Sequence, residues 1–235
     1  MPAGAIVAGL FEWSALPAWP TIRADLFQHV ELSVLAVGIG SAIALPLAVA
    51  AWRYRVVRLP VFAFSSALYV VPSLALFVMI LPVTGIGSVL TAEVALVGYT
   101  LLILVMNIVA GLEAVPPDVR EATAAMGYSA PAALMRVDLV LALPYVFGGL
   151  RIAMTTVVGL VTVTALIGLG GLGRLITTGF NADNGTEVLA GLVLSVALAA
   201  AFDLLLVGLE KLFAPWARGQ RRPRGVRRAA IGARG

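Results

Sequence analysis

Long runs of uncharged, apolar residues constrain this chain more than any other feature. The longest run extends from Leu59 to Ala92, and residues 32–52 form another without a charge. A helix needs about 20 consecutive apolar residues to cross a bilayer. Hydrophobic residues make up 61% of the chain and charged residues 12%, so the chain carries more apolar surface than a soluble core could bury. The sequence therefore predicts an all-α polytopic membrane protein.

Five transmembrane helices follow from these runs. Pro82, Gly85 and Gly87 favour a break within the longest run. The predicted spans cover residues 32–52, 59–81, 89–112, 139–166 and 188–209.

The basic residues are distributed unevenly around these spans. One set of connecting segments holds Arg53, Arg55, Arg58, Arg120, Arg136, Lys211 and the arginines from Arg218 onward. The other set holds only Arg23 and Arg174. Since Lys and Arg are enriched in short cytoplasmic loops, we expect an outer N-terminus and a cytoplasmic C-terminus.

We expect three segments along the chain. Residues 1–30 contain several Trp and Pro residues, have no basic n-region and no convincing cleavage site, and indicate an aromatic segment at the outer interface. Residues 31–213 are predicted to form the transmembrane domain. Residues 214–235 are a basic tail, predicted to be disordered in the cytoplasm, which would bind membrane lipid or fix the topology rather than bind nucleic acid.

A polar segment, residues 116–137, separates the third and fourth spans. The spacing of Asp118 and Glu121 is that of a capping box at the start of a helix. Gly127 favours the left-handed conformation that ends a helix, and Ser129 followed by Pro131 favours the start of another. The segment is therefore predicted to be a helix-turn-helix loop, which the arginine distribution places in the cytoplasm.

This segment resembles the EAA loop of permease subunits of type I ATP-binding-cassette (ABC) importers. The family pattern is Glu-Ala-Ala, then Gly, then Ile-x-Leu-Pro. This chain has Glu121-Ala122-Thr123, then Gly127, then Val137-Asp138-Leu139. Thr123 replaces the second alanine of the pattern, and Val140 replaces its proline.

In that family the loop is a coupling helix that docks on the ATPase subunit. The resemblance implies this role for Glu121, Ala122, Thr123, Ala125, Met126 and Gly127. The alternative is that Glu121 only caps a helix and that the alanines only favour helicity.

A glycine-rich run, Gly168, Gly170, Gly171 and Gly173, follows the fourth predicted span. It satisfies the pattern Gly-x-Gly-x-x-Gly, but a dinucleotide site needs a preceding strand, and here a membrane helix precedes it. We expect these glycines to form a tight turn on the outer side and to let neighbouring backbones approach closely. A similar turn and outer loop occur in permeases for quaternary-amine osmoprotectants, and this similarity covers roughly residues 31–213.

Two charged residues fall inside predicted spans, Arg151 in the fourth and Asp203 in the fifth. A charge at bilayer depth is costly and is normally paired or turned toward a cavity. Counted from the cytoplasmic ends of the spans, the depths of the two residues differ by about 8 Å, much of which a long arginine side chain covers. We expect an ion pair between two helices, with a role in substrate binding as the alternative.

Composition excludes several kinds of chemistry. The chain has no cysteine and a single histidine, His29, so it offers no disulfide, thiolate nucleophile or multi-histidine metal site. His29 is expected at a membrane interface. The only lysine, Lys211, lies outside any Gly-Lys-Ser/Thr pattern, so the chain cannot build a P-loop. We predict no catalytic residue, no metal and no cofactor.

The resemblance implies the transmembrane subunit of an ATP-driven importer in a bacterial or archaeal cell membrane. The implied partners are ABC ATPase subunits, a second permease subunit, either identical or paralogous, and an extracytoplasmic substrate-binding protein. The implied substrate is a small quaternary-amine osmolyte such as glycine betaine, choline or carnitine. The alternatives are the same machinery for methionine or another small metabolite, a membrane scaffold, and an ion-coupled secondary carrier, for which no internal repeat is visible.

Overall fold

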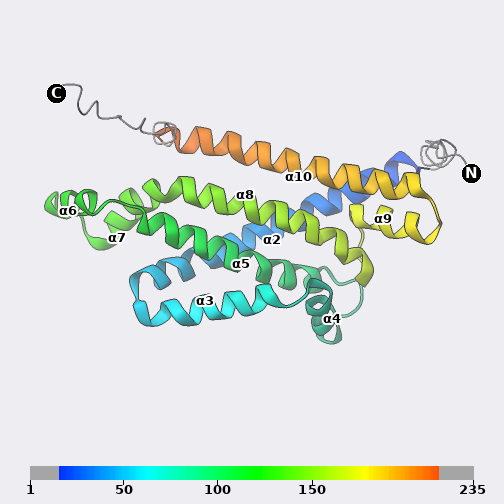
Figure 1. Ribbon diagram of the computed structural model, residues 1–235, viewed down its shortest axis with the longest axis horizontal. Coiled ribbons are helices and arrows are strands. Elements are labelled where there is room, and N and C mark those ends of the chain that lie inside the picture. Colours follow the sequence, from blue (N-terminus) through cyan, green and yellow to red (C-terminus); the bar gives the residue numbers. More distant parts are fainter. Residues whose placement is uncertain (1–15, 217–235) are drawn as a thin grey trace, which may run out of the picture.

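The computed structural model describes residues 16–216, and every regular element in this part of the chain is helical. Four long helices run along the longest axis of the molecule (Figure 1). They are α2 (Trp19–Arg53), α5 (Val89–Glu113), α8 (Leu139–Val163) and α10 (Gly185–Phe213).

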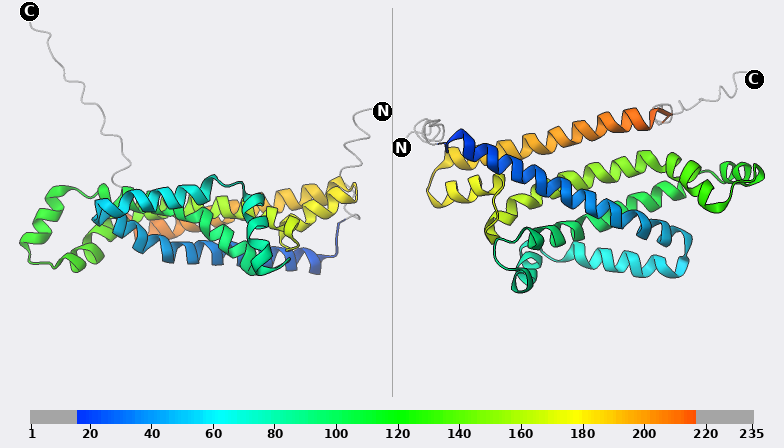
Figure 2. Two further views of the ribbon diagram at one scale, coloured as in Figure 1. Left: turned by 90° about the horizontal axis from the view of Figure 1, so that it is seen from below. Right: turned by 180° about the vertical axis from the view of Figure 1, so that it is seen from behind.

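The shorter helices lie beside the long ones or at their ends. α3 (Arg55–Val70) runs alongside α5, whereas α6 (Pro117–Ala125), α7 (Ala130–Ala133) and the π-helix η2 (Leu134–Asp138) project from one end of the bundle (Figures 1 and 2). Toward the other end lie α4 (Ser73–Thr84), the 3₁₀-helix η3 (Thr164–Ile167) and α9 (Leu172–Asn181).

The helices agree with the predicted fold class. Within the described residues, four helices are long and apolar enough to cross a bilayer, and the bent pair α3–α4 makes a fifth if it is counted as one span. One of the four is the continuous stretch Ala130–Ile167, in which α7, η2, α8 and η3 follow one another without a gap. The prediction of an all-α membrane protein with about five spans is confirmed.

The second predicted span, residues 59–81, corresponds to two helices joined by a bend rather than to one continuous helix. α3 ends at Val70 and α4 starts at Ser73, and the two helices are bent by 97° relative to each other. The cause is Pro72, which disfavours the α-conformation at the residue before it, and Val71 is accordingly extended, with a ψ of 129°. α3 alone has 16 residues, or about 24 Å, which is less than the thickness of a bilayer core.

The expected boundary at residue 30 falls inside a helix. α2 starts at Trp19, tolerates Pro20 in its first turn, and continues unbroken to Arg53. Residues 19–30 are therefore part of the first long helix, while residues 1–15 of the expected interfacial segment lie outside the described residues.

Contacts among α2, α5 and α8 form the centre of the molecule. Leu32, Phe77, Leu96 and Val157 are among the residues buried in one apolar cluster there. Small residues let the helices approach closely: a Cβ added to Gly149 on α8 would lie 2.7 Å from the Cβ of Asn107 on α5. This use of glycine at helix contacts is typical of membrane bundles.

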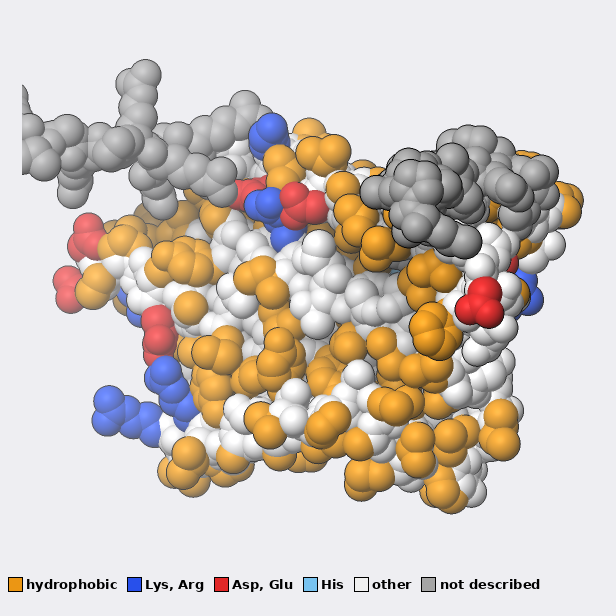
Figure 3. Space-filling model, turned by 45° about the vertical axis from the view of Figure 1, so that its right-hand side comes forward, with side chains coloured by type: hydrophobic (Ala, Val, Ile, Leu, Met, Phe, Trp, Pro, Cys, Tyr) orange, Lys and Arg blue, Asp and Glu red, His pale blue; other side chains and the backbone are white. Residues whose placement is uncertain are grey.

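The outer surface of the bundle is strongly apolar. Hydrophobic side chains are spread across the whole of the described face in Figure 3, and charged side chains are few and lie mainly toward its edges. α3 buries only Ser65 fully, and α10 exposes large side chains such as Leu204 and Leu205. A surface of this kind requires lipid or another subunit against it.

Candidate functional site

The end of the bundle that carries α6 is where the sequence predicted a helix-turn-helix loop. α6 begins at Pro117, whose missing N–H is tolerated in the first turn of a helix. The predicted capping box is wrong, because α6 has no side-chain hydrogen bond at its N-cap, Pro116. Asp118 nevertheless lies in the first turn, where a carboxylate interacts favourably with the helix dipole.

Gly127 adopts the conformation expected of it. Its φ is +80°, in the left-handed region, and the backbone N–H of Gly127 donates to the carbonyl of Ala124 at 2.9 Å. Ser129 occupies the N-cap position of α7 as predicted, although its side chain makes no capping hydrogen bond, and α7 leads directly through η2 into α8. The loop is therefore a helix, a glycine turn and a second short helix continuous with a span.

The residues expected to contact a partner differ in exposure. Glu121, Ala122, Ala125, Met126 and Gly127 are exposed, and Met126 retains 67% of its accessible surface. Thr123 is only 3% exposed, and its hydroxyl donates to the carbonyl of Val119 at 2.7 Å. The expectation that Thr123 contacts a partner is therefore corrected: it faces the bundle.

Arg120 connects α6 to the long helices, a role that the sequence reasoning missed. Its Nε donates to Oδ1 of Asp138 at 2.9 Å, and its Nη2 donates to the carbonyl of Leu112. Its guanidinium also lies over the ring of Trp52, 5.1 Å from the centroid. The sequence showed Arg120 only as one basic residue of a loop, since its partners are distant in the chain.

A cleft of about 650 Å³ lies next to this connection. Its walls come from the last turns of α2, including Trp52 and Tyr54, and from the projecting segment, including Thr123, Tyr128 and Val137. The projecting segment is therefore separated from α2 by open space over part of its length.

Arg151 and Asp203 meet between α8 and α10. Nε of Arg151 lies 2.6 Å from Oδ1 of Asp203, and Nη2 lies 2.9 Å from Oδ2. Both side chains keep 32% of their accessible surface, so the pair lies at the edge of the bundle. This bidentate geometry is the strongest form of an arginine–carboxylate contact.

The glycine run lies at the opposite end of the molecule. Gly168 and Gly171 have positive φ values of 86° and 77°. A Cβ on Gly170 would overlap the side-chain oxygen of Gln28, and one on Gly173 would overlap the carbonyl of Thr162. The tight turn and the close backbone approach are therefore confirmed.

His29 lies buried beneath this glycine turn rather than exposed at an interface. The backbone N–H of Leu172 donates to Nδ1 of His29 at 3.2 Å. Nδ1 is then an acceptor, so Nε2 carries the proton and donates to the carbonyl of Val158 at 3.0 Å. His29 thus joins α2, α8 and α9, and the expectation of an interfacial histidine is wrong.

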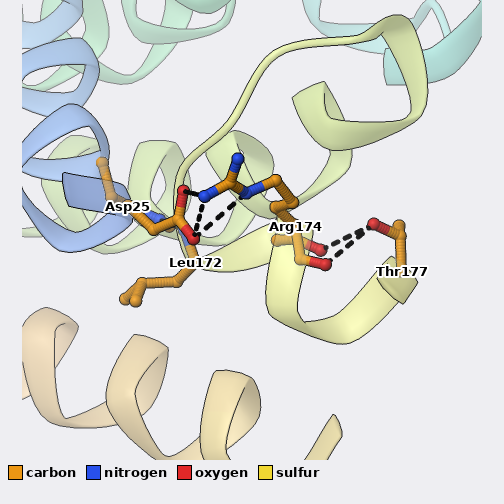
Figure 4. Close-up of polar contacts among 6 residues, drawn as sticks. Asp25, Leu172, Arg174 and Thr177 are labelled. Carbon is orange, nitrogen blue, oxygen red and sulfur yellow. Dashed lines mark hydrogen bonds and ion pairs between the residues drawn. The ribbon is translucent and has the colours of Figure 1, made fainter. Parts of the chain in front are cut away.

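A second contact at this end was also missed. Arg174 on α9 pairs with the buried carboxylate of Asp25 on α2 at 2.9 Å, and the hydroxyl of Thr177 donates to the carbonyl of Arg174 at 3.1 Å (Figure 4). Asp25 and Arg174 are 149 positions apart in the sequence, so no local signal indicates this pair.

Glu93 is the unusual carboxylate of α5. It is 8% exposed, and neither of its side-chain oxygens has a hydrogen-bond partner. The third predicted span ran across this position without giving it a role.

The chain is similar over most of its length to proteins of one membrane family. A family model described as "Binding-protein-dependent transport system inner membrane component" matches residues 24–219. The osmoprotectant import permease protein OsmW of Salmonella typhimurium is 36% identical over 194 residues, covering 80% of this chain and 90% of that protein. The glycine betaine/carnitine/choline transport system permease protein OpuCD of Bacillus subtilis is 32% identical, covering 81% and 83%.

Solved structures resemble the fold as well. The inward-facing MetNI methionine ABC transporter contains a chain that superposes with a TM-score of 0.73 at 23% identity, covering 84% of this chain and 99% of that one. Identity at this level supports the shared fold and nothing about the substrate.

Proposed function

This chain belongs to the family of binding-protein-dependent transport system inner membrane components, and we propose that it forms half of the path for a small quaternary-amine osmolyte. A second permease subunit, identical or paralogous, supplies the other half. The apolar surface left exposed on α3 and α10 supports this pairing, since part of it would be covered by that subunit.

The surface formed by Glu121, Ala122, Ala125, Met126 and Gly127 docks on the partner ATPase. The observation that carries this proposal is that these residues are exposed together on α6 and on the turn after it, which project from the bundle. Thr123, which is buried, supports this coupling surface from behind. The alternative was that Glu121 merely caps a helix. The absence of a side-chain hydrogen bond at the N-cap of α6 argues against it.

ATP hydrolysis takes place on the separate ATPase subunits. Lys211 is the only lysine of this chain, and the residues around it do not form a phosphate-binding loop. A substrate-binding protein outside the membrane delivers the substrate. The ATPase then drives the switch between inward-facing and outward-facing arrangements of the spans.

The proposed orientation places α6 in the cytoplasm and α9 outside. Arg53, Arg55 and Arg58 lie at or next to the α2–α3 junction, and Arg120 and Arg136 lie in the α6–η2 segment, at the end of the bundle from which α6 projects. Lys and Arg near span ends favour the cytoplasmic side.

Glycine betaine, choline and carnitine are the substrates that the names of the bacterial relatives support. Methionine is less well supported, because the MetNI likeness rests on 23% identity. Ergothioneine is the second candidate, since the ergothioneine transport permease/binding protein EgtU of Helicobacter pylori is 37% identical over 151 residues. This chain covers 27% of that longer protein.

The test is uptake by proteoliposomes that contain the permease with its ATPase and binding protein. We expect uptake of radiolabelled glycine betaine, choline or carnitine that requires internal ATP and stops with an ATPase variant lacking its P-loop lysine. Uptake of ergothioneine alone would select the second candidate. Uptake of none of these four compounds by an assembled, ATP-hydrolysing complex would overturn the proposed substrate class.

A further inference from the structure

We propose that Arg120 rigidly links the coupling surface to α8, so that the two move as one body. This proposal rests on the function proposed above, and the connection is called the Arg120 link. The coupling surface lies on α6 and the turn after it. α8 contains Arg151 and packs at the centre of the bundle. Transport requires that a displacement of α6 reach the spans rather than be absorbed by the loop around it. Arg120 is then a positioning residue for the transport cycle.

The first observation is that Arg120 makes the side-chain hydrogen bonds that connect α6 to the rest of the bundle. Within residues 16–216, the side-chain hydrogen bonds from α6 to other elements all come from Arg120. The one other side-chain hydrogen bond of α6, from Thr123 to Val119, stays inside the helix. The cleft between α2 and the projecting segment leaves α6 without continuous packing on that side.

The second observation is where the contacts of Arg120 end. Asp138 is the last residue of η2 and is 5% exposed, Leu112 lies in the last turn of α5, and Trp52 lies at the end of α2. One guanidinium therefore holds the ends of three spans with its planar set of donors and its face. A lysine offers a point charge in place of that fork and cannot hold all three partners in the same way.

The third observation is the π-helical turn between the projecting segment and α8. The backbone N–H of Leu139 donates to the carbonyl of Leu134, five residues earlier, in place of the usual four. Such a turn is a local irregularity in which a helix can bend. The Arg120–Asp138 ion pair closes across this irregularity, because Asp138 is its last residue and α6 precedes it. Without the pair, α6 and α8 would be joined only through α7 and η2.

Substitution of Arg120 should therefore uncouple ATP hydrolysis from uptake. In proteoliposomes with the partner subunits, Arg120→Met and Asp138→Asn are expected to keep ATP hydrolysis within about twofold of the wild type while uptake falls at least tenfold. Arg120→Lys should retain part of the uptake. The matched control is Arg58→Met, because Arg58 also forms an ion pair at this end, with Glu113 at 2.6 Å, but does not touch α6; it should change neither rate.

A second measurement follows the Arg120 link directly, as the distance between α6 and η2, and it can be made even if uptake is lost. The chain has no native cysteine, so spin labels can be placed at Asp118 on α6 and at Met135 on η2, both of which are exposed and outside the coupling surface. We expect the distance between the labels to stay constant when ATP is trapped in the wild-type complex. In Arg120→Met the distance should change or its distribution should broaden.

The outcomes distinguish a failure of the Arg120 link from a failure of the proposed function. Two results for Arg120→Met would overturn the Arg120 link. One is an unchanged ratio of ATP hydrolysed to substrate imported, and the other is a label distance that matches the wild type in all states. A parallel loss of assembled complex, hydrolysis and uptake, with unchanged label distances in what remains, would reduce Arg120 to a structural residue. Failure of the wild-type complex to import any of the tested compounds would instead count against the proposed function.

Discussion

Gly127 is the residue whose identity depends most directly on backbone conformation. A Cβ at this position would have no atom within 4 Å, so space does not demand glycine, whereas the φ of +80° does. A left-handed conformation costs a bulkier residue about 1–2 kcal/mol. We predict that Gly127→Val misplaces α7 relative to α6 and lowers uptake at least severalfold while the permease still inserts in the membrane.

Gly127→Asn is the matched control for that substitution. Asparagine tolerates the left-handed conformation, so this variant should keep most of the uptake. The measurement is ATP-dependent uptake normalised to the amount of assembled complex. Equal uptake by the Val and Asn variants would show that the turn conformation does not matter for transport.

The Arg151–Asp203 pair is the second feature at this scale. Removing one partner leaves the other charge without its bidentate contact, and because both side chains are 32% exposed the loss is smaller than for a fully buried pair. Arg151→Met and Asp203→Leu should each lower the thermal stability of the purified complex. The double variant should recover much of the loss, and strictly additive losses would contradict a direct coupling.

Only some residue contacts were within reach of sequence reasoning. The left-handed Gly127 follows from local chemistry, and the meeting of Arg151 with Asp203 follows from the high cost of unpaired charge in a membrane. His29, Arg120 and Asp25 were not foreseen in their contacts, because their partners are fixed by how distant helices pack. A buried Asp25 near the start of a helix is locally indistinguishable from a solvated one.

At the scale of elements, α9 depends on glycine at its contact with α8. A Cβ on Gly173 would overlap the carbonyl oxygen of Thr162, and a backbone atom cannot rotate away as a side chain can. We predict that Gly173→Ala destabilises the complex by about 1–3 kcal/mol, as overpacking does elsewhere. Gly148→Ala is the control, because a Cβ there meets no atom within 4 Å.

The melting temperatures of the two purified variants decide this prediction. Gly148→Ala should melt at or above the wild-type temperature, since alanine favours helices over glycine. Gly173→Ala should melt several degrees lower. Identical melting of the two variants would mean that α9 can move away from α8 without cost.

Element boundaries were predictable where apolar runs end in charge or glycine. α5 and α10 begin and end within about four residues of the predicted third and fifth spans. The break predicted at residues 81–87 is present, because α4 ends at Thr84 and α5 begins at Val89, whereas the bend between α3 and α4 was not predicted. Pro82 lies inside the last turns of α4, whereas Pro72 turns the chain.

At the scale of the whole molecule, the chain exposes surfaces that are expected to be covered by lipid and by partner subunits. Large apolar side chains such as Val83, Leu204 and Leu212 are exposed along its flanks, and α6 projects from one end. Both features are expected of a subunit that lies against lipid and a second permease and receives force from an ATPase.

Site-specific cross-linking tests most directly whether the coupling surface meets the ATPase. In the assembled complex, Met126→Cys should cross-link to the ATPase subunit through a short bifunctional reagent, and Ala182→Cys, exposed beside α9 at the opposite end, should not. The account predicts a cross-link from position 126 alone. A cross-link from position 182 without one from position 126 would contradict both the coupling surface and the proposed orientation.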